Sequence, residues 1–380
     1  MSDILVAAAG RAWERDVLHL VAGLDASAAG RRCVDVADLL ALASMGTSRA
    51  AVLSLKLTGL DADTVHRLGA LGVQVVAIIE SDDAADRASM LGIEHLVSSD
   101  RLDDLERILG TWSPPLPVEQ ESSGDGTLTV VWGPSGAPGR STLALNLGAE
   151  LAHMGRPTIL VDADPYGGTL AQMLAILDEV SGLLAATRAA NSGNGASLAE
   201  QLVTVGPKLA LLSGLPRSDL WPQLRPGAVA RVIDEATRQC DHVIADVGFC
   251  LEGPDRFDSS APHRNQTTLQ LLAAADRIVA VGAADPLGLS RFARGLLELR
   301  DVAPAAELTV VINKRRPSLG WSTKEITETI QRLTGVSPDA VLPQDVAAVD
   351  RALMKGQSLR ESAPDSALRK AITELSAVIR

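Results

Sequence analysis

The stretch that most constrains the fold is residues 127–142, which read TLTVVWGPSGAPGRST. Residues 127–132 are apolar and rich in β-branched side chains, which is typical of a short buried strand. Residues 143–152 are mostly Leu and Ala and predict a helix that packs closely on a sheet. The loop between them carries Gly133, Gly136 and Gly139. A strand, a glycine-rich loop and a helix start predict a cradle in which backbone N–H groups bind a phosphate.

Arg140 and Ser141 follow this loop where the helix is predicted to begin. The Ser141 hydroxyl is placed to ligate a nucleotide-bound Mg²⁺, as in the pattern G-x-x-x-x-G-K-[ST]. The chain departs from that pattern twice, because Pro134 stands at the first glycine and Arg140 replaces the lysine. By itself the loop is consistent with a phosphate site or a plain glycine-rich turn, and the rest of the chain favours the phosphate site.

Two further apolar strands, predicted at residues 157–162 and 241–246, end in carboxylates. After the first, Asp162 and Asp164 point to opposite faces if the strand continues, and both reach the site if the chain turns. A following proline and two glycines favour the turn. A carboxylate here can hold Mg²⁺-bound water or orient an attacking water, and a capping Asp is the alternative. Asp246, after the second strand, fits the metal-side acid of a phosphate-loop site.

An amide, Asn313, follows a strand predicted at residues 308–312. Its paired donor and acceptor groups can read the edge of a base at a strand's carboxyl end. The basic run at residues 314–316 is either a solvated loop or a contact to phosphate or a partner.

Residues 1–110 alternate short apolar runs with amphipathic stretches, which predicts a small parallel α/β unit. The expected strands lie at residues 4–8, 33–36, 51–55, 73–79 and 95–97. In order and size this unit resembles the receiver domain of response regulators. Its acidic pair, acceptor Asp and Lys are missing from the ends of the first, third and fifth strands. Asp61 and Asp63 come later and predict a helix start. We therefore expect a degenerate receiver-like docking module.

Residues 111–126, TWSPPLPVEQESSGDG, combine prolines with Ser, Gly and acidic residues, which predicts a linker. A long surface loop is the alternative. The predicted fold class is α/β: a small degenerate receiver-like domain, residues 1–110, precedes a larger P-loop NTPase domain, residues 127–380, with a mostly parallel sheet.

Composition narrows the function classes. A formal net charge of −12 counts against a broad nucleic-acid footprint. The three cysteines lack metal-ligand spacing and suit a reducing compartment. The first residues lack the features of a signal peptide, and no apolar run approaches the ~20 residues of a membrane span. We expect a cytoplasmic protein without an integral membrane segment.

Several segments together resemble the MinD/ParA branch of P-loop ATPases: GAPGRST, VDADP, DHVIADVG, VINK and LPQDVAAVDRALMKG. The receiver-like domain placed before them resembles the CpaE/TadZ subfamily. The resemblance implies ATP and Mg²⁺ as cofactors. It implies that the phosphates are bound by Gly133, Gly136, Ala137, Gly139, Arg140, Ser141 and Thr142.

The same resemblance assigns roles to the carboxylates and the amide. It implies that Asp164 orients the attacking water and that Arg140 acts on the transferred phosphate. Ser141, Asp162 and Asp246 would form the metal site, and Asn313 would contact adenine.

The loop departs from the family in ways that bear on hydrolysis. Ser135 stands where the family has a signature lysine that reaches the other subunit's nucleotide. Arg140 keeps the loop charge but is broader and forked. Pro134 and Pro138 remove two N–H donors. We expect nucleotide binding with slow hydrolysis, or binding alone.

The resemblance implies an ATP-dependent dimerising switch that positions pilus, secretion or division machinery. We expect a homodimer with ATP, recruited to a membrane-associated complex, with a protein partner on the receiver-like domain. The alternatives are a nucleotide-binding pseudo-ATPase adaptor and a ParA-like DNA segregation ATPase.

If ATP brings two subunits face to face, a cation must offset the negative charge of their two triphosphates. Ser135 cannot supply it. The loop at residues 253–268 follows the strand that ends in Asp246 and carries Arg256 and Arg264. We expect Arg264 to act across the interface as an arginine finger does. A solvated loop residue is the alternative.

We predict that the receiver-like domain takes up no phosphoryl group, because the acids that would accept it are absent. The full chain should keep its intact mass after incubation with acetyl phosphate, while a competent receiver treated in parallel gains a phosphoryl group. A stoichiometric adduct on Asp61 or Asp63 would contradict this prediction.

Overall fold

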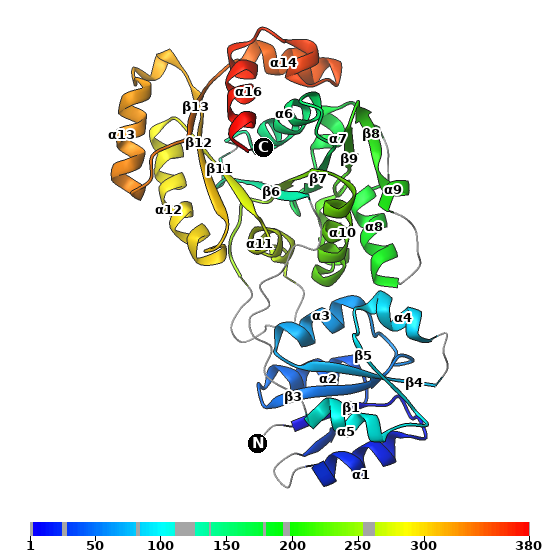
Figure 1. The fold of residues 1–380 in the computed structure, drawn as a ribbon. Coiled ribbons are helices and arrows are strands. Elements are labelled where there is room, and N and C mark those ends of the chain that lie inside the picture. Colours follow the sequence, from blue (N-terminus) through cyan, green and yellow to red (C-terminus); the bar gives the residue numbers. More distant parts are fainter. Residues whose placement is uncertain are drawn as a thin grey trace.

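The computed structural model describes residues 3–24, 29–80, 84–110, 126–136, 138–177, 180–192, 198–253 and 263–379. Two sheets, each with helices on both faces, follow one another along the chain (Figure 1). This arrangement confirms the predicted α/β fold class. Across the described residues, no helix combines the length and the apolar character needed to cross a membrane.

The first sheet is parallel, with strand order β2-β1-β3-β4-β5. Its strands are β1 (Asp3–Ala7), β2 (Gly30–Arg32), β3 (Ser48–Ser54), β4 (Gln74–Ile79) and β5 (His95–Ser98). Its helices are α1 (Glu14–Leu24), α2 (Val36–Ser44), α3 (Ala62–Ala70), α4 (Ala84–Leu91) and α5 (Asp103–Gly110). Helices α2, α3 and α4 contribute to one apolar cluster, and α1 and α5 to the other. Burial on both faces explains the almost continuous apolar runs of the inner strands.

The strand predicted at residues 33–36 is displaced, because the structure forms β2 at Gly30–Arg32 instead. Asp35 explains the difference: its side chain accepts the Asp38 backbone N–H at 2.9 Å and caps α2. Capping draws Val36 into a helix. The expected helix start at Asp61 is confirmed, since Asp61 accepts the Thr64 backbone N–H at 2.8 Å.

Two cations share one carboxylate at the carboxyl edge of the first sheet. Arg11 lies after β1, Lys56 after β3 and Glu80 after β4. Nη1 of Arg11 is 3.4 Å from Glu80 Oε2, and Nζ of Lys56 is 3.3 Å from the same oxygen. Basic side chains thus follow β1 and β3, the first and third strands, after which a receiver domain carries its acidic pair and its acceptor Asp.

The second sheet has strand order β13-β12-β11-β6-β10-β7-β9-β8 and is parallel except for β8. Its strands are β6 (Thr127–Trp132), β7 (Thr158–Ala163), β8 (Val203–Gly206), β9 (Leu209–Leu212), β10 (His242–Val247), β11 (Arg277–Ala283), β12 (Glu307–Arg315) and β13 (Ala340–Pro343). The helices around it are α6 (Arg140–His153), α7 (Leu170–Met173), α8 (Gly182–Ser192), α9 (Leu198–Gln201), α10 (Pro226–Gln239), α11 (Gln266–Ala273), α12 (Pro286–Val302), α13 (Thr323–Thr334), α14 (Val346–Lys355), α15 (Leu359–Ser362) and α16 (Ala367–Ile379).

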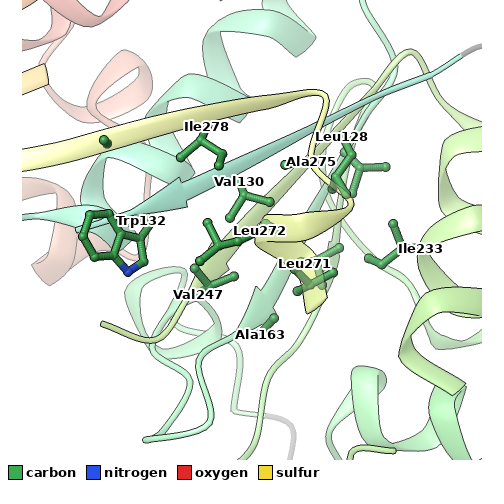
Figure 2. Packing of buried hydrophobic residues seen from close by; sticks show 14 of the residues in the cluster. Leu128, Val130, Trp132, Ala163, Ile233, Val247, Leu271, Leu272, Ala275 and Ile278 are labelled. Carbon is green, nitrogen blue, oxygen red and sulfur yellow. The ribbon is translucent and has the colours of Figure 1, made fainter. Parts of the chain in front are cut away.

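Strand β6 lies between β10 and β11 and carries the predicted phosphate loop at its end. Leu128, Val130 and Trp132 belong to the apolar cluster shown in Figure 2, together with residues of α11 and β11. Val131 belongs to the cluster on the opposite face, with α6. This alternation places apolar side chains on both faces, as expected for a central parallel strand. The loop therefore begins from a rigid, fully buried strand.

The two α/β units contact each other through α3, which packs on α10 and α8 (Figure 1). Nδ2 of Asn191 donates to Asp61 at 3.1 Å, and the Gly227 backbone N–H donates to Asp63 at 3.4 Å. Asp63 is buried, which raises the pKa of its carboxyl above the ordinary value. The predicted linker at residues 111–126 lies outside the described residues except for Gly126, which donates its backbone N–H to Thr237.

We predict that Gly227→Ala weakens the docking of the two units. A Cβ at Gly227 would lie 2.7 Å from the His66 Cβ and 2.8 Å from the Ala62 carbonyl oxygen. Overpacking of this kind costs about 1–3 kcal/mol. Small-angle scattering should show a larger radius of gyration for this variant.

Gly69→Ala is the matched control, because Gly69 also lies at this interface helix but has open space around its Cβ position. Equal radii of gyration for both variants and the wild type would argue against the predicted role of Gly227.

Candidate phosphate-binding site

The phosphate loop joins β6 to α6 at the carboxyl edge of the second sheet. Gly136 and Gly139 have φ angles of 108° and 97°, a region in which other residues are strained. Gly139 is the N-cap of α6, and no side chain caps the helix there. The first N–H groups of α6 therefore lack the usual side-chain acceptor and can bind an anion. Ala137, also predicted in the phosphate set, lies outside the described residues.

Gly133 and Thr142 lie at the two ends of this segment. A Cβ at Gly133 would lie 2.3 Å from the Val281 carbonyl oxygen, so glycine is required there by packing against β11. Thr142 lies in the first turn of α6, and its carbonyl oxygen accepts from Asn146 at 2.8 Å. Neither observation tests a contact of these residues with phosphate, which stays a prediction.

Arg140 folds back on the loop. Its Nη1 donates to the carbonyl oxygens of Gly133 at 3.0 Å and Pro134 at 3.4 Å. Its Nη2 lies 3.5 Å from Asp164 Oδ2, and the side chain is only 13% exposed. A forked guanidinium can make all three contacts at once. In this structure the arginine therefore braces the loop and pairs with the carboxylate opposite.

Ser141 and Asp246 meet at the start of α6. The Ser141 side chain lies near enough to the Asp246 carboxylate to oppose a rise in its pKa. Strand β10 lies directly beside β6, which brings Asp246 to the end of the loop strand. Oδ1 of Asp246 is buried without a hydrogen-bond partner among the described residues. Burial, reinforced by the charge of Asp162, raises the pKa of Asp246 to about 8.

Asp162 lies beside Asp246 on the neighbouring strand. It also caps a turn, which is the alternative role that the sequence indicates for a carboxylate at this position. Its Oδ2 accepts the backbone N–H groups of Thr169 at 2.8 Å and Leu170 at 2.9 Å, at the start of α7. Its Oδ1 has no hydrogen-bond partner in the described part of the chain. Burial raises the pKa of Asp162 to about 6. One oxygen therefore holds the turn, and the other remains for a ligand.

Asp164 reaches the site because the chain turns there, as the following Pro and Gly residues predicted. Strand β7 ends at Ala163, and Asp164 Oδ1 accepts the Tyr166 backbone N–H at 2.9 Å. Its other oxygen faces Arg140. Burial raises the pKa of Asp164, and the nearby Arg140 charge opposes that rise.

Asn313 is brought to the loop from a distant part of the chain. Strand β12 continues to Arg315, three residues beyond the predicted end of the strand. Nδ2 of Asn313 donates to the Pro138 carbonyl oxygen at 2.9 Å, and Oδ1 accepts the Lys314 backbone N–H at 2.8 Å. The amide nitrogen thus joins β12 to the loop, and the amide oxygen bonds within β12. The adenine contact stays a prediction, and it would exchange one of these hydrogen bonds.

Beside Asp164 lies an aromatic cluster that sequence reasoning missed. The ring centroids of Tyr166 and Phe249 are 4.8 Å apart. The Arg264 guanidinium carbon lies 5.1 Å from the Tyr166 centroid and 5.8 Å from that of Trp221. Tyr166 Oη also donates to Asn265 Oδ1 at 2.8 Å. The signal available in the sequence was the single tyrosine, two residues after Asp164.

This cluster bears on the proposed arginine finger. In the single chain Arg264 packs on two aromatic rings and is partly buried. Its role across an interface stays a prediction, and Arg256 lies outside the described residues. In the part of the chain that the structure describes, no group of three or more His, Cys, Asp or Glu side chains is arranged to hold a metal ion.

No family model and no curated protein matches the sequence. Solved structures do match. A ParA family ATPase from Chlorobium tepidum is 20% identical, with a TM-score of 0.56 over 66% of this chain and 98% of that one. The septum site-determining protein MinD from Pyrococcus horikoshii, complexed with Mg-ADP, is 18% identical, with a TM-score of 0.53 over 67% and 96%. A chain of the MinC:MinD cell division protein complex from Aquifex aeolicus is 18% identical, with a TM-score of 0.50 over 67% of this chain and 95% of that one.

These matches show a shared fold. The larger domain has the MinD/ParA ATPase fold, and the five-stranded domain is an addition in front of it.

We predict that the metal-free protein loses stability as the pH rises from about 4 to about 8. The buried Asp162 and Asp246 have pKa values raised to about 6 and about 8, above the ordinary 3.8. In this window the folded protein holds protons that the unfolded chain has released, so the free energy of unfolding falls. Asp246→Asn should lessen this loss by at least about 1.4 kcal/mol, the equivalent of a single pKa unit.

Urea unfolding at several pH values, with a chelator present, measures how steeply the free energy of unfolding falls with pH. The control is Asp365→Asn, because that side chain is 98% exposed. If the free energy of unfolding of Asp246→Asn falls with pH as steeply as that of the wild type, the prediction is wrong.

Proposed function

We propose that the larger domain binds Mg²⁺-ATP and that the protein is an ATP-dependent dimerising switch of the CpaE/TadZ kind. In this proposal it positions pilus, secretion or division machinery. The MinD/ParA fold and the additional α/β domain before it support this reading. A nucleotide is also bound in the MinD structure from Pyrococcus horikoshii.

The observation that carries the proposal is the buried pair of carboxylates, Asp162 and Asp246, at the end of the loop strand, each with one oxygen that lacks a hydrogen-bond partner among the described residues. In phosphate-loop enzymes a loop hydroxyl and a strand-end acid together hold the Mg²⁺ of the nucleotide. Asp246 is 1% exposed and keeps one oxygen without a hydrogen-bond partner among the described residues. A buried carboxylate of this kind needs a proton or a cation. These residues therefore fit a metal, with Asp162 as the adjoining acid.

The loop fits the phosphates equally well. The left-handed Gly136 and Gly139 shape the backbone, and the uncapped start of α6 supplies positive dipole charge. Mg²⁺, when bound, would neutralise charge on the phosphate oxygens.

In this proposal Asp164 orients the attacking water. One oxygen of its carboxylate accepts the Tyr166 backbone N–H, and the other lies 3.5 Å from Nη2 of Arg140. A fixed carboxylate can direct a water without reorganising during the reaction. The raised pKa of Asp164 also suits a group that accepts a proton.

Slow hydrolysis follows from the position of Arg140. Its guanidinium is bound to the loop's own carbonyl oxygens and to Asp164. Both terminal nitrogens are thus engaged away from a phosphate, and only the buried Nε lacks a hydrogen-bond partner among the described residues. Losing one well-placed charge stabiliser removes about 2.7–4 kcal/mol from the transition state.

The second function that a specific observation favours is a nucleotide-binding adaptor without turnover. The contacts of Arg140 with the loop's carbonyl oxygens support this reading, as does the ion pairing of Arg11 and Lys56 with Glu80 at the edge of the first sheet. Both proposals share nucleotide binding and a partner docked on the first domain. Turnover, measured as phosphate release, separates them.

We predict that the full chain binds Mg²⁺-ATP in titration calorimetry and that Ser141→Ala weakens binding about 10-fold or more, the size of effect seen when metal sites are perturbed. With a chelator in place of Mg²⁺, the two proteins should bind alike, because the hydroxyl acts through the metal. Ser135→Ala, which removes an exposed loop hydroxyl, is the control.

Light scattering on the same samples should show a dimer only with Mg²⁺-ATP. Folded wild-type protein that gives no heat up to millimolar ATP would rule out the proposed site. Binding without dimerisation or turnover would favour the adaptor.

A further inference from the structure

Helix α12 is fixed against the strand and loop of the candidate site. A Cβ at Gly295 would lie 2.8 Å from Cη2 of Trp132 and 3.6 Å from the Pro134 Cβ. Phe292 is fully buried, and a Cβ at Gly282 of β11 would lie 2.7 Å from its ring. Figure 1 shows α12 alongside β11 and β12. Small residues at these contacts let the helix approach closely, so its position relative to the loop is rigid.

One turn before Gly295, this helix places Arg291 over the phosphate loop. A Cβ at Gly136 would lie 2.6 Å from Nη1 of Arg291. Gly136 is exposed and has a left-handed backbone, so the guanidinium lies at the open side of the loop. Any residue other than glycine at position 136 would collide with this guanidinium unless it moved.

Arg291 differs from the other arginines around it. Within the described residues its exposed side chain makes no hydrogen bond and no ion pair. Arg140 is bound to loop carbonyl oxygens and Asp164, and Arg264 packs on two rings. Arg294, one turn further along α12, contacts Ser290 at 3.3 Å. Arg291 thus holds an uncompensated charge beside an anion cradle, in a protein of net charge −12.

We infer that Arg291 is a phosphate-binding residue of this site and supplies from α12 the positive charge that the loop lacks at Ser135. This inference rests on the proposed nucleotide binding. A guanidinium is the group best suited to bridge two phosphate oxygens, because its parallel N–H donors match their spacing. Its rigid base on α12 limits the entropy lost on binding. The same chain therefore provides the cation, without a second subunit.

Calorimetry on the full chain with Mg²⁺-ATP tests the inference with Arg291→Ala, Arg291→Lys and Arg294→Ala. One lost charge-assisted hydrogen bond weakens binding about 10- to 100-fold, so Arg291→Ala should lose that much affinity. Arg291→Lys should recover part of it. Arg294→Ala should stay within about twofold of wild type, because that side chain is bound to its own helix. Melting temperatures without nucleotide should agree for all four proteins, since both arginines are exposed.

The outcomes separate this inference from the proposal beneath it. Wild-type protein that does not bind Mg²⁺-ATP overturns both. Wild-type binding that is unchanged in Arg291→Ala overturns the role of Arg291 and leaves the nucleotide site standing. An equal loss in Arg294→Ala also overturns it, because the effect would then come from net charge.

Discussion

Two carboxylates buried side by side constrain the rest of the candidate site. The register of β7 and β10 pairs Asp162 with Asp246, and each is 1% exposed. Desolvation and mutual repulsion disfavour two charges there, which is why their pKa values rise. Glu150 on α6 is buried as deeply, but two arginines pair with it, Arg360 and Arg369. Among the described residues no such ion pair reaches the aspartates. The site thus retains acceptor groups that a bound cation would satisfy.

The site is also joined by contacts to the interface between the two α/β units. Asp164 holds the backbone of Tyr166, whose hydroxyl donates to Asn265 at the start of α11. The next residue, Gln266, donates to the Leu224 carbonyl oxygen at 2.9 Å, two residues before α10 begins. Helix α10 then packs on α3. A nucleotide that repositioned the turn at Asp164 would therefore act on elements in direct contact with the first unit. Coupling through them requires two arrangements of these elements.

Much of this architecture could be predicted because its signals are local. The apolar run before Gly133 is a central strand, since only a strand buried on both faces has so little polar alternation. The turn at Asp164 follows from the Pro and Gly residues after it. The helix start at Asp61 follows from a short acceptor side chain at the N-cap. The error at residues 33–36 has the same origin, because two local signals compete there and the cap at Asp35 prevails.

The sequence alone therefore determined the α/β class and the position of the glycine loop, because these depend on residue periodicity and turn chemistry. The tertiary structure decided which distant groups meet at that loop. Sheet order and register bring Asn313 to Pro138, Asp162 to Asp246 and Arg291 to Gly136. No spacing in the chain encodes these pairs, since each depends on how strands and helices pack. The same packing turned Arg140 onto the loop's own carbonyl oxygens, a contact set by three-dimensional distance and not by sequence pattern.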